Sequence, residues 1–294
     1  MVNMLAIVLN ICNFSIRHIS FLPFSELNRH RKIMFRTKVF LLLGLMFSFN
    51  VSSFGQDLVG VVAKISPSVV GVGTLTPIRG NNIELKGTGF VFGNGTYIAT
   101  NHHVVSEELS VDMVQHRVVM SGTGKDFDVH IVEVVDFDPL FDLAILKIKD
   151  QSVSLPSNFT FADDKFIPIG TKIAFTGFPI GAILGLYPST HIGIIAAITP
   201  DALPANSAKE LNPQLMERLR KKFNIYQLDA TAYPGNSGSP LYDQDTGQVI
   251  GVINKVLARE GREYALSAPT GISYAIPVKH LRNLATRNNI ELEE

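Results

Sequence analysis

A short segment of the chain places one serine between two glycines, in the order Tyr233-Pro234-Gly235-Asn236-Ser237-Gly238-Ser239-Pro240. Glycine adopts backbone conformations that a side chain would resist, so the Ser237 hydroxyl and the surrounding amides can face a substrate carbonyl. A serine hydroxyl is a weak nucleophile at neutral pH, and it needs a nearby base and donors for the oxyanion that forms on attack. The segment therefore predicts nucleophilic catalysis by Ser237, with an oxyanion hole at Gly235, Asn236 and Ser237. The alternative is an ordinary Gly-Asn-Ser-Gly turn between two strands.

A histidine that could serve as the base lies upstream, in Thr100-Asn101-His102-His103-Val104. Imidazole suits a group that acts first as a base and then as an acid, because it titrates near neutral pH. His103 follows an expected strand that ends at Thr100 and precedes apolar residues, which favours it as the histidine that points into a cleft. Its neighbour His102 is expected to point elsewhere.

The third group must hold the imidazole in one tautomer and stabilise its cation, which requires a buried carboxylate. Asp142 directly precedes the apolar run Leu143-Ala144-Ile145-Leu146, so it can be buried at the head of a strand. Asp136 and Asp138 are alternatives, although Asp138-Pro139 is typical of a turn. With Asp142, the three groups follow one another in the order histidine, aspartate, serine, as they do in proteases built on paired β-barrels.

The composition is that of an ordinary globular protein and argues against several other functions. The 294 residues are 46% hydrophobic and 18% charged, and 26 basic side chains balance 26 acidic ones. A formal charge of zero gives no electrostatic footprint for nucleic acid or an anionic membrane. The single cysteine, Cys12, excludes disulfides and zinc–thiolate sites, and His102-His103 lacks the i, i+4 spacing of a helical zinc site. We predict no metal and no cofactor.

The N-terminal region has the pattern of a secretory leader. An uncharged apolar run of eleven residues, 39–49, follows a basic cluster and is well short of the roughly 20 residues that cross a bilayer as a helix. Small residues then stand in Ser53-Phe54-Gly55, where a signal peptidase that cuts before Gln56 would require them. We therefore expect an exported protein, periplasmic or extracellular, without a stable membrane span; a retained N-terminal anchor is the alternative.

This interpretation divides the chain into two parts. Residues 1–55 are expected to be an N-terminal extension and signal segment, with Met34 as an alternative start, and residues 56–294 are expected to form the functional domain. A domain of that length can bury a sufficient core without cross-links.

Beyond Gln56, short β-branched and aromatic runs recur between glycine, proline and asparagine turns, which predicts an all-β fold of barrels or sandwiches. Asn94-Gly95 is a strong hairpin signal. A short helix is expected at each end of the domain, at 56–65 and 278–286, and an amphipathic helix at 213–223 inside a long insertion, 200–224, where it is either a surface helix or a lid. The expected strands are 68–73, 89–92, 96–100, 130–135, 143–148, 172–176, 191–198, 225–228, 249–254 and 272–276.

Taken together, five ordered segments resemble the HtrA-type, DegP-like branch of the trypsin-like serine peptidases. They are Thr100-Asn101-His102-His103-Val104, Asp138-Pro139-Leu140-Phe141-Asp142-Leu143-Ala144, Gly177-Phe178-Pro179-Ile180-Gly181, Asp229-Ala230-Thr231-Ala232-Tyr233-Pro234-Gly235-Asn236-Ser237-Gly238 and Gly271-Ile272-Ser273-Tyr274-Ala275-Ile276-Pro277. The resemblance implies a chymotrypsin-like fold of two six-stranded antiparallel β-barrels with the catalytic groups in the cleft between them. It also implies that His103, Asp142 and Ser237 are the catalytic residues of a peptidase that forms an acyl-enzyme.

The chain departs from the family pattern at three places. Ser239 replaces the glycine that usually follows the Ser-Gly pair, but Gly235 and Gly238 are present. Only 17 residues follow Pro277, too few for the PDZ domain that many relatives carry. The insertion at 200–224 is longer than expected and leaves the shape of the cleft and the oligomeric state open.

The residues expected around the substrate pocket are neutral. Cleavage after Lys or Arg requires an acid at the base of this pocket, but the residue six positions before Ser237 is Thr231. The resemblance implies a pocket for small or medium aliphatic side chains, and Thr231 and Asn254 are the candidate lining residues. Substrates are expected to be proteins or peptides, not nucleic acids.

Two other functions compete with this interpretation. An esterase of the α/β-hydrolase type needs Gly-x-Ser-x-Gly, whose last position is Ser239 here, and a histidine after the serine, where only His280 stands on an expected surface helix. A secreted binding or scaffold module that keeps the barrel but has little turnover is the more serious alternative, because one fold can host many functions.

Overall fold

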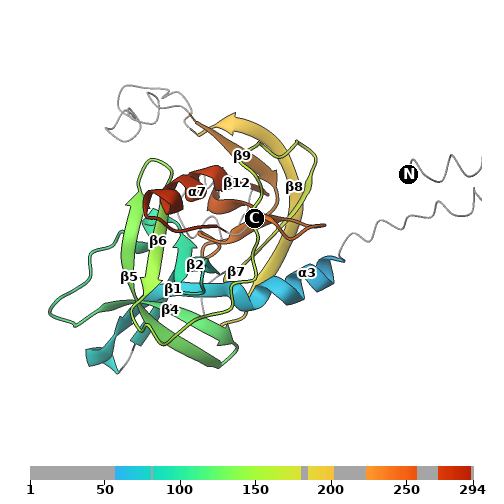
Figure 1. Ribbon diagram of the computed structural model, residues 1–294. Helices are drawn as coiled ribbons and strands as arrows, with labels where there is room; N and C mark the ends of the chain where they lie inside the picture. Colours follow the sequence, from blue (N-terminus) through green and yellow to red (C-terminus); the bar gives the residue numbers. More distant parts are fainter. Residues whose placement is uncertain (1–56, 81, 180–184, 202–222, 257–270, 293–294) are drawn as a thin grey trace, which may run out of the picture. The chain divides into compact units, whose positions relative to one another are not determined.

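Twelve strands among the described residues close into two six-stranded antiparallel barrels, in the orders β1-β2-β3-β6-β5-β4 and β10-β11-β12-β9-β8-β7 (Figure 1). The computed structural model describes residues 57–80, 82–179, 185–201, 223–256 and 271–292. They belong to a single unit, Gly55–Glu294. The expected fold class is confirmed, whereas the leader at 1–55 and all but the last residue, Phe223, of the helix expected at 213–223 lie outside the described residues.

The first barrel is built from strands in the N-terminal half of this unit. β2 and β3 form the hairpin expected at Asn94-Gly95, where Phe92 pairs with Tyr97 and Gly95 has a φ of 83°, a value that favours glycine. β1 closes the barrel because it pairs with both β2 and β4. The strands are β1 Val69–Thr76, β2 Asn82–Phe92, β3 Tyr97–Thr100, β4 His116–Thr123, β5 Asp126–Asp138 and β6 Leu143–Ile148.

The second barrel repeats this arrangement further along the chain. β7 pairs with β8 and β10, and β9 pairs with β8 and β12, so the sheet again closes. Its strands are β7 Lys172–Gly177, β8 Ser189–Pro200, β9 Asn224–Asp229, β10 Pro240–Asp243, β11 Val249–Val256 and β12 Ile272–Pro277. All ten expected strands are present; β4 and β10 were not expected.

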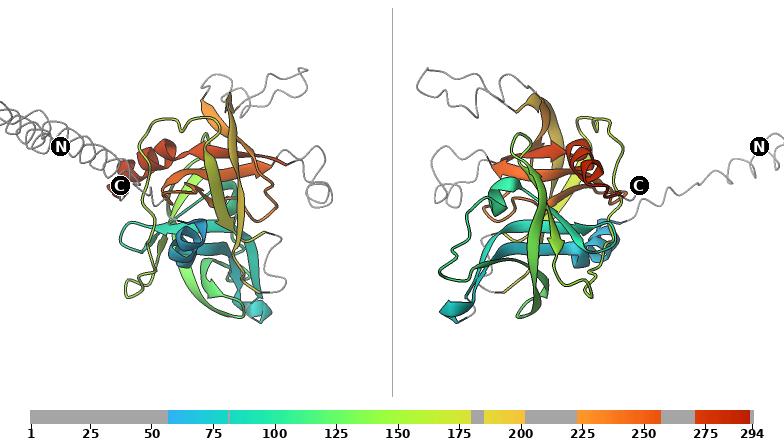
Figure 2. Two further views of the ribbon diagram at one scale, coloured as in Figure 1. Left: turned by 90° about the vertical axis from the view of Figure 1, so that its right-hand side faces the viewer. Right: turned by 60° about the vertical axis from the view of Figure 1, so that its left-hand side comes forward.

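A shared apolar core holds the barrels together. Each barrel has its own cluster of buried side chains, but a third cluster joins Phe90 of β2, Tyr242 of β10 and Leu281 of the C-terminal helix. Phe90 also contacts Phe159 edge to face, with ring centroids 5.5 Å apart. Fully burying one such side chain contributes about 1.5–3 kcal/mol, so the relative position of the barrels is set by packing. Both views in Figure 2 show them side by side, and β7 contacts β1 and β2.

Two helices at the ends of the unit complete this core, as expected from the sequence. α3, Leu58–Ile65, buries Val61 and Ile65, and α7, Val278–Arg287, contacts strands of both barrels. His280 stands on the helix that was expected at the surface, but its own side chain faces the core and is only 8% exposed. The other helical segments of the described residues are a single turn each, namely η1 Ser66–Ser68, η2 Pro77–Arg79 and α4 His102–Val105. No helix within the described stretches has the length and apolar character that a membrane span requires.

Candidate active site

The pairing of β3 with β6 brings the candidate histidine to the candidate aspartate. Thr100 at the end of β3 pairs with Ala144 near the start of β6, so the residues that follow β3 and precede β6 lie at the same end of the sheet. His103, in α4, donates from its backbone N to Asp142 Oδ1 at 2.8 Å. Its ring Nδ1 lies 2.6 Å from Asp142 Oδ2. One carboxylate therefore holds both the backbone and the ring of His103, and the ring contact orients the imidazole as a catalytic base requires.

Three residues besides His103 donate hydrogen bonds to Asp142. Its backbone is left-handed, with a φ of 52°, an uncommon conformation that aspartate tolerates better than most residues. Its carbonyl accepts hydrogen bonds from the Asn101 side chain at 3.0 Å and from the His102 amide at 3.1 Å. Its Oδ2 also accepts from Asn254 Nδ2 at 2.9 Å, and the side chain is only 13% exposed. These contacts fix the carboxylate, so its position does not depend on the histidine alone.

The two alternative aspartates are engaged elsewhere. Asp138 Oδ1 accepts from the amides of Leu140 and Phe141 and so caps the turn before β6. Burial alone would raise the pKa of Asp136, but hydrogen bonds from Asn288 and Arg287 outweigh it and the pKa is lowered. Neither carboxylate is hydrogen-bonded to a histidine among the described residues.

The candidate nucleophile is connected to this pair through Asn254. Ser237 lies in the loop between β9 and β10, and its Oγ donates to the Asn254 carbonyl at 3.1 Å. The Asn254 side chain contacts Asp142, so hydrogen bonds link Ser237, Asn254, Asp142 and His103 in sequence. Among the described contacts no hydrogen bond joins Ser237 to His103 directly. The His103 ring is 48% exposed, and its Nε2 has no partner within the described part of the chain.

The loop around Ser237 leaves two amides for an oxyanion. Gly235 and Gly238 have φ values of 104° and 88°, conformations that L side chains rarely adopt. The amide of Asn236 donates to Tyr233 O at 3.0 Å, and the amide of Gly238 donates to Ile253 O at 2.8 Å. The amides of Gly235 and Ser237 have no acceptor among the described residues. Asn236 is therefore not an available donor, contrary to the expectation from sequence.

The floor of this loop is polar and closely packed. The Asn236 side chain is fully buried, and its Nδ2 lies 3.4 Å from His191 Nε2. Burial lowers the pKa of His191, which stacks on Phe175. Ser239 Oγ is buried and has no hydrogen-bond partner among the residues that the structure describes, and a Cβ added to Gly177 would overlap it. An alanine at position 177 would therefore require the Ser239 side chain to move.

The two expected pocket residues have different environments. Thr231 is half-buried in the loop that precedes Ser237, and its place in a substrate pocket stays a prediction. Asn254 is 6% exposed, and its side chain is engaged with the carboxylate of Asp142. Sequence reasoning missed the contact between Asn254 and Asp142. It also missed Thr88 of the first barrel, whose hydroxyl donates to the Gly235 carbonyl in the loop around Ser237. The glycines on both sides of Thr88 were the one local signal of a close approach.

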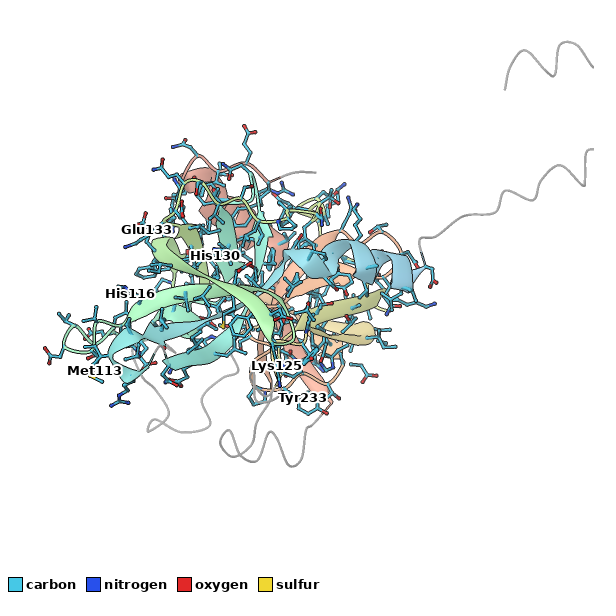
Figure 3. All side chains as sticks on the ribbon, turned by 90° about the horizontal axis from the view of Figure 1, so that it is seen from below. Met113, His116, Lys125, His130, Glu133 and Tyr233 are labelled. Carbon is cyan, nitrogen blue, oxygen red and sulfur yellow. The ribbon has the colours of Figure 1, made fainter. Side chains whose placement is uncertain are left out.

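A second Ser–His pair lies on the first barrel and lacks the other parts of a catalytic site. Ser121 Oγ is 3.0 Å from His130 Nε2 on the neighbouring strands β4 and β5. His130 and Glu133 are labelled on β5 in Figure 3, on a different part of the molecule from Tyr233, which begins the serine loop, residues 233–239. No carboxylate is hydrogen-bonded to His130 within the described residues, and the same residues contain no cluster of side chains that could hold a metal ion.

Known proteins with similar sequences are peptidases. The family described as "Trypsin-like peptidase domain" matches residues 87–252. A probable periplasmic serine endoprotease, DegP-like, from Chlamydia muridarum is 30% identical over 193 residues, which are 66% of this chain and 31% of that protein. The serine protease Do-like HtrA of Lactococcus lactis subsp. lactis is 27% identical over 79% of this chain and 56% of its own length. This chain thus spans about a third to just over half of these two relatives.

Solved structures agree with the fold. The active form of the Rv3671c protease from M. tuberculosis superimposes with a TM-score of 0.56 at 23% sequence identity, over 80% of this chain and 86% of that one. At this identity the similarity concerns the fold alone. In this chain the fold consists of two paired β-barrels.

Proposed function

Because the chain belongs to the trypsin-like peptidase family, we propose that it is an exported serine endopeptidase whose catalytic triad is His103, Asp142 and Ser237. The observation that carries the proposal is the contact of 2.6 Å between His103 Nδ1 and Asp142 Oδ2, in a histidine whose Nε2 is left without a partner among the described residues. A carboxylate on Nδ1 keeps the proton there and leaves Nε2 able to accept one.

The chemistry begins when Ser237 exchanges one hydrogen bond for another. Its hydroxyl turns from the Asn254 carbonyl, to which it donates at 3.1 Å, toward His103 Nε2. Oγ then attacks the carbonyl carbon of the peptide, and its proton passes to Nε2. Asp142 stabilises the resulting imidazolium. Contacts of this kind are often loose in the free enzyme and shorten when substrate binds.

The tetrahedral intermediate places negative charge on the former carbonyl oxygen. The amides of Gly235 and Ser237 are the available donors beside Ser237, and they suit this oxygen. The C–N bond then breaks as His103 returns its proton to the leaving amine, and an acyl-enzyme remains. Water, deprotonated by His103, attacks the acyl group and releases the second product.

We assign protein or peptide substrates with small or medium aliphatic residues at the cleavage site. The neutral Thr231 before the serine loop supports this preference, and so does the resemblance of the ordered motifs to the HtrA-type branch. Export is supported by the leader pattern at 34–55 and by the Chlamydia relative, which is described as periplasmic. Profiling of cleavage sites in a denatured protein mixture tests the preference, and cleavage mainly after Lys or Arg would contradict it.

A fluorophosphonate probe tests the nucleophile. The Ser237 oxygen attacks phosphorus and fluoride leaves, so the full-length protein should label, and the Ser237→Ala variant should not. Folded protein that does not label and does not cleave peptides would support the alternative, a binding module on the same fold.

The two neighbouring histidines provide a matched pair of variants. His103→Ala should lower kcat/KM for a peptide substrate by about 10⁴-fold or more, as removal of a triad member does in related chemistry. His102→Ala should retain most of the activity, because its ring stacks on Phe137 with centroids 4.6 Å apart and does not contact Asp142. If His102→Ala were the inactive variant, the assignment of the base would be wrong.

A further inference from the structure

Thr88 lies where the first barrel comes closest to the serine loop. It is fully buried on β2 between Gly87 and Gly89, and β2 lies beside β7 of the second barrel (Figure 1). A Cβ added to Gly87 would lie 3.0 Å from Ser237 O, and one added to Gly238 would overlap the Thr88 carbonyl. Glycine on both sides of the contact therefore allows the two backbones to meet.

Three hydrogen bonds of Thr88 cross this contact. Its amide donates to Ser237 O at 2.8 Å. Its hydroxyl donates to Gly235 O at 2.7 Å and accepts from the Phe178 amide at 3.0 Å. Because a hydroxyl has one proton, the donor from Phe178 leaves that proton for Gly235. The side chain thus acts on a single carbonyl of the loop.

The bond to Gly235 determines how the loop presents its amide. On one side of the Gly235–Asn236 peptide the carbonyl is held by Thr88, and on the other the Asn236 amide is held by Tyr233 O at 3.0 Å. With this peptide plane fixed, the direction of the Gly235 amide depends on the torsions of Gly235 itself, whose φ is 104°. Glycine has little intrinsic preference among such conformations, so an external contact must select one.

We propose that the Thr88 hydroxyl is a positioning residue for the oxyanion hole, which holds the Gly235 carbonyl against the first barrel and thereby keeps the Gly235 amide directed at the substrate. The inference rests on the proposed peptidase function. It makes the geometry of the hole depend on the docking of two barrels, since the hydroxyl comes from one barrel and the amide from the other. Loss of the hydroxyl should weaken transition-state binding more than substrate binding, because only the transition state carries the full oxyanion charge.

The test compares full-length Thr88→Ser with Thr88→Ala, two variants that differ by a single oxygen atom. We expect Thr88→Ala to lower kcat by about 10- to 100-fold with little change in KM, as small misplacements of catalytic donors do. Its inhibition constant for a peptide boronic acid, which forms a tetrahedral adduct with serine, should rise by a similar factor. Thr88→Ser keeps the donor and should restore most of the kcat and of the boronate affinity.

Thr176→Val is the control for lost stability alone. The Thr176 hydroxyl is equally buried and bonds to Thr190 and Tyr242, neither of which belongs to the serine loop, so its loss should lower the free energy of unfolding without the fall in kcat. The proposal is overturned if folded Thr88→Ala keeps kcat within about threefold of the parent, or if Thr88→Ser falls as far as Thr88→Ala. Failure of Thr88→Ala to fold, when Thr88→Ser folds, would show a structural role and overturn it too.

The outcome for the parent protein separates the two proposals. If the parent labels with fluorophosphonate and cleaves peptides, but the two Thr88 variants have the same activity, the positioning role of Thr88 is wrong and the peptidase function stands. If the folded parent neither labels nor cleaves peptides, both proposals are wrong, because the positioning role of Thr88 rests on the peptidase function.

Discussion

His280 is a buried histidine beside the turn at 139–142 that contains Asp142, and it should make stability depend on pH. Its ring stacks on Phe141, the residue before Asp142, with centroids 3.8 Å apart, and contacts Phe223 at 5.5 Å. Both ring nitrogens are buried without a hydrogen-bond partner in the described part of the chain. Burial first, and then the nearby Lys279 cation, lowers the pKa of His280 to about 4, although Asp138 and Asp164 act in the opposite direction.

The size of the effect follows from the difference between the folded and unfolded pKa. The pKa falls from 6.5 when unfolded to about 4 when folded, and each unit corresponds to about 1.4 kcal/mol, so the total is about 3 kcal/mol. Between these two values the unfolded chain binds more protons than the folded one. The folded state therefore loses this stability as the pH drops from about 6.5 to about 4, and it keeps all of it at neutral pH.

Replacement of His280 by a group that does not titrate should remove this loss of stability at low pH. Two variants separate the effect of titration from the cost of burying polar atoms. His280→Phe keeps an aromatic ring against Phe141 and removes both unpaired nitrogens, so its stability at neutral pH should equal or exceed that of the parent. His280→Gln also cannot titrate in this range but still buries polar atoms, so it should be less stable than His280→Phe at every pH.

Urea unfolding of the three proteins at a series of pH values from 7.5 to 4 is the assay. Relative to either variant, the parent should lose about 3 kcal/mol more of its unfolding free energy over this range. Groups that titrate in all three proteins cancel in that difference. Parallel curves for parent and variants, or a His280 ring that titrates near pH 6.5 by NMR in the folded protein, would refute the reasoning.

Two further variants test the packing around Ser237. Asn254→Ala removes the donor to Asp142 Oδ2 at 2.9 Å and should lower kcat/KM about tenfold or more, since a hydrogen bond to a charged group contributes about 1.5–3 kcal/mol. The control is Asn158→Ala, which loses a hydrogen bond from its side-chain amide to Lys64 O in α3, and equal activity of both variants would argue against the role of Asn254. Gly177→Ala should destabilise the fold by about 1–3 kcal/mol, because its Cβ would overlap Ser239 Oγ and lie 2.9 Å from Asn236 Oδ1. Ser239→Gly in the same chain should recover part of this loss in chemical denaturation, and strictly additive effects of the two changes would contradict the clash.

Much of the fold could be predicted because its elements are marked by local patterns. β6 is a run of apolar residues bounded by turns, the β2–β3 hairpin carries Asn94-Gly95, and α7 follows Pro277 with apolar residues at helical spacing. β4 and β10 were missed for local reasons as well. β4 ends in the polar sequence Ser121-Gly122-Thr123, and β10 has only four residues, so both depend on the strands beside them.

The candidate site also combines residues that could be nominated from the sequence with contacts that could not. Residue chemistry was enough to nominate His103, Asp142 and Ser237, since few side-chain types can act as base, orienting acid and nucleophile. It could not show that the Asn236 amide is used inside its own loop, or that Asn254 bonds to Asp142. These contacts join residues from different strands, and no spacing along the chain encodes them.

The amino-acid sequence by itself determined the class of elements and the types of group available for catalysis, because turns, strands and helices depend on neighbours a few residues away. Only the tertiary structure decided that Thr88 reaches Gly235 across 147 positions of the chain and that His280 is buried. The physical reason is that such contacts depend on how the two barrels close and pack through a common core, and that packing is settled by all of the buried side chains at once.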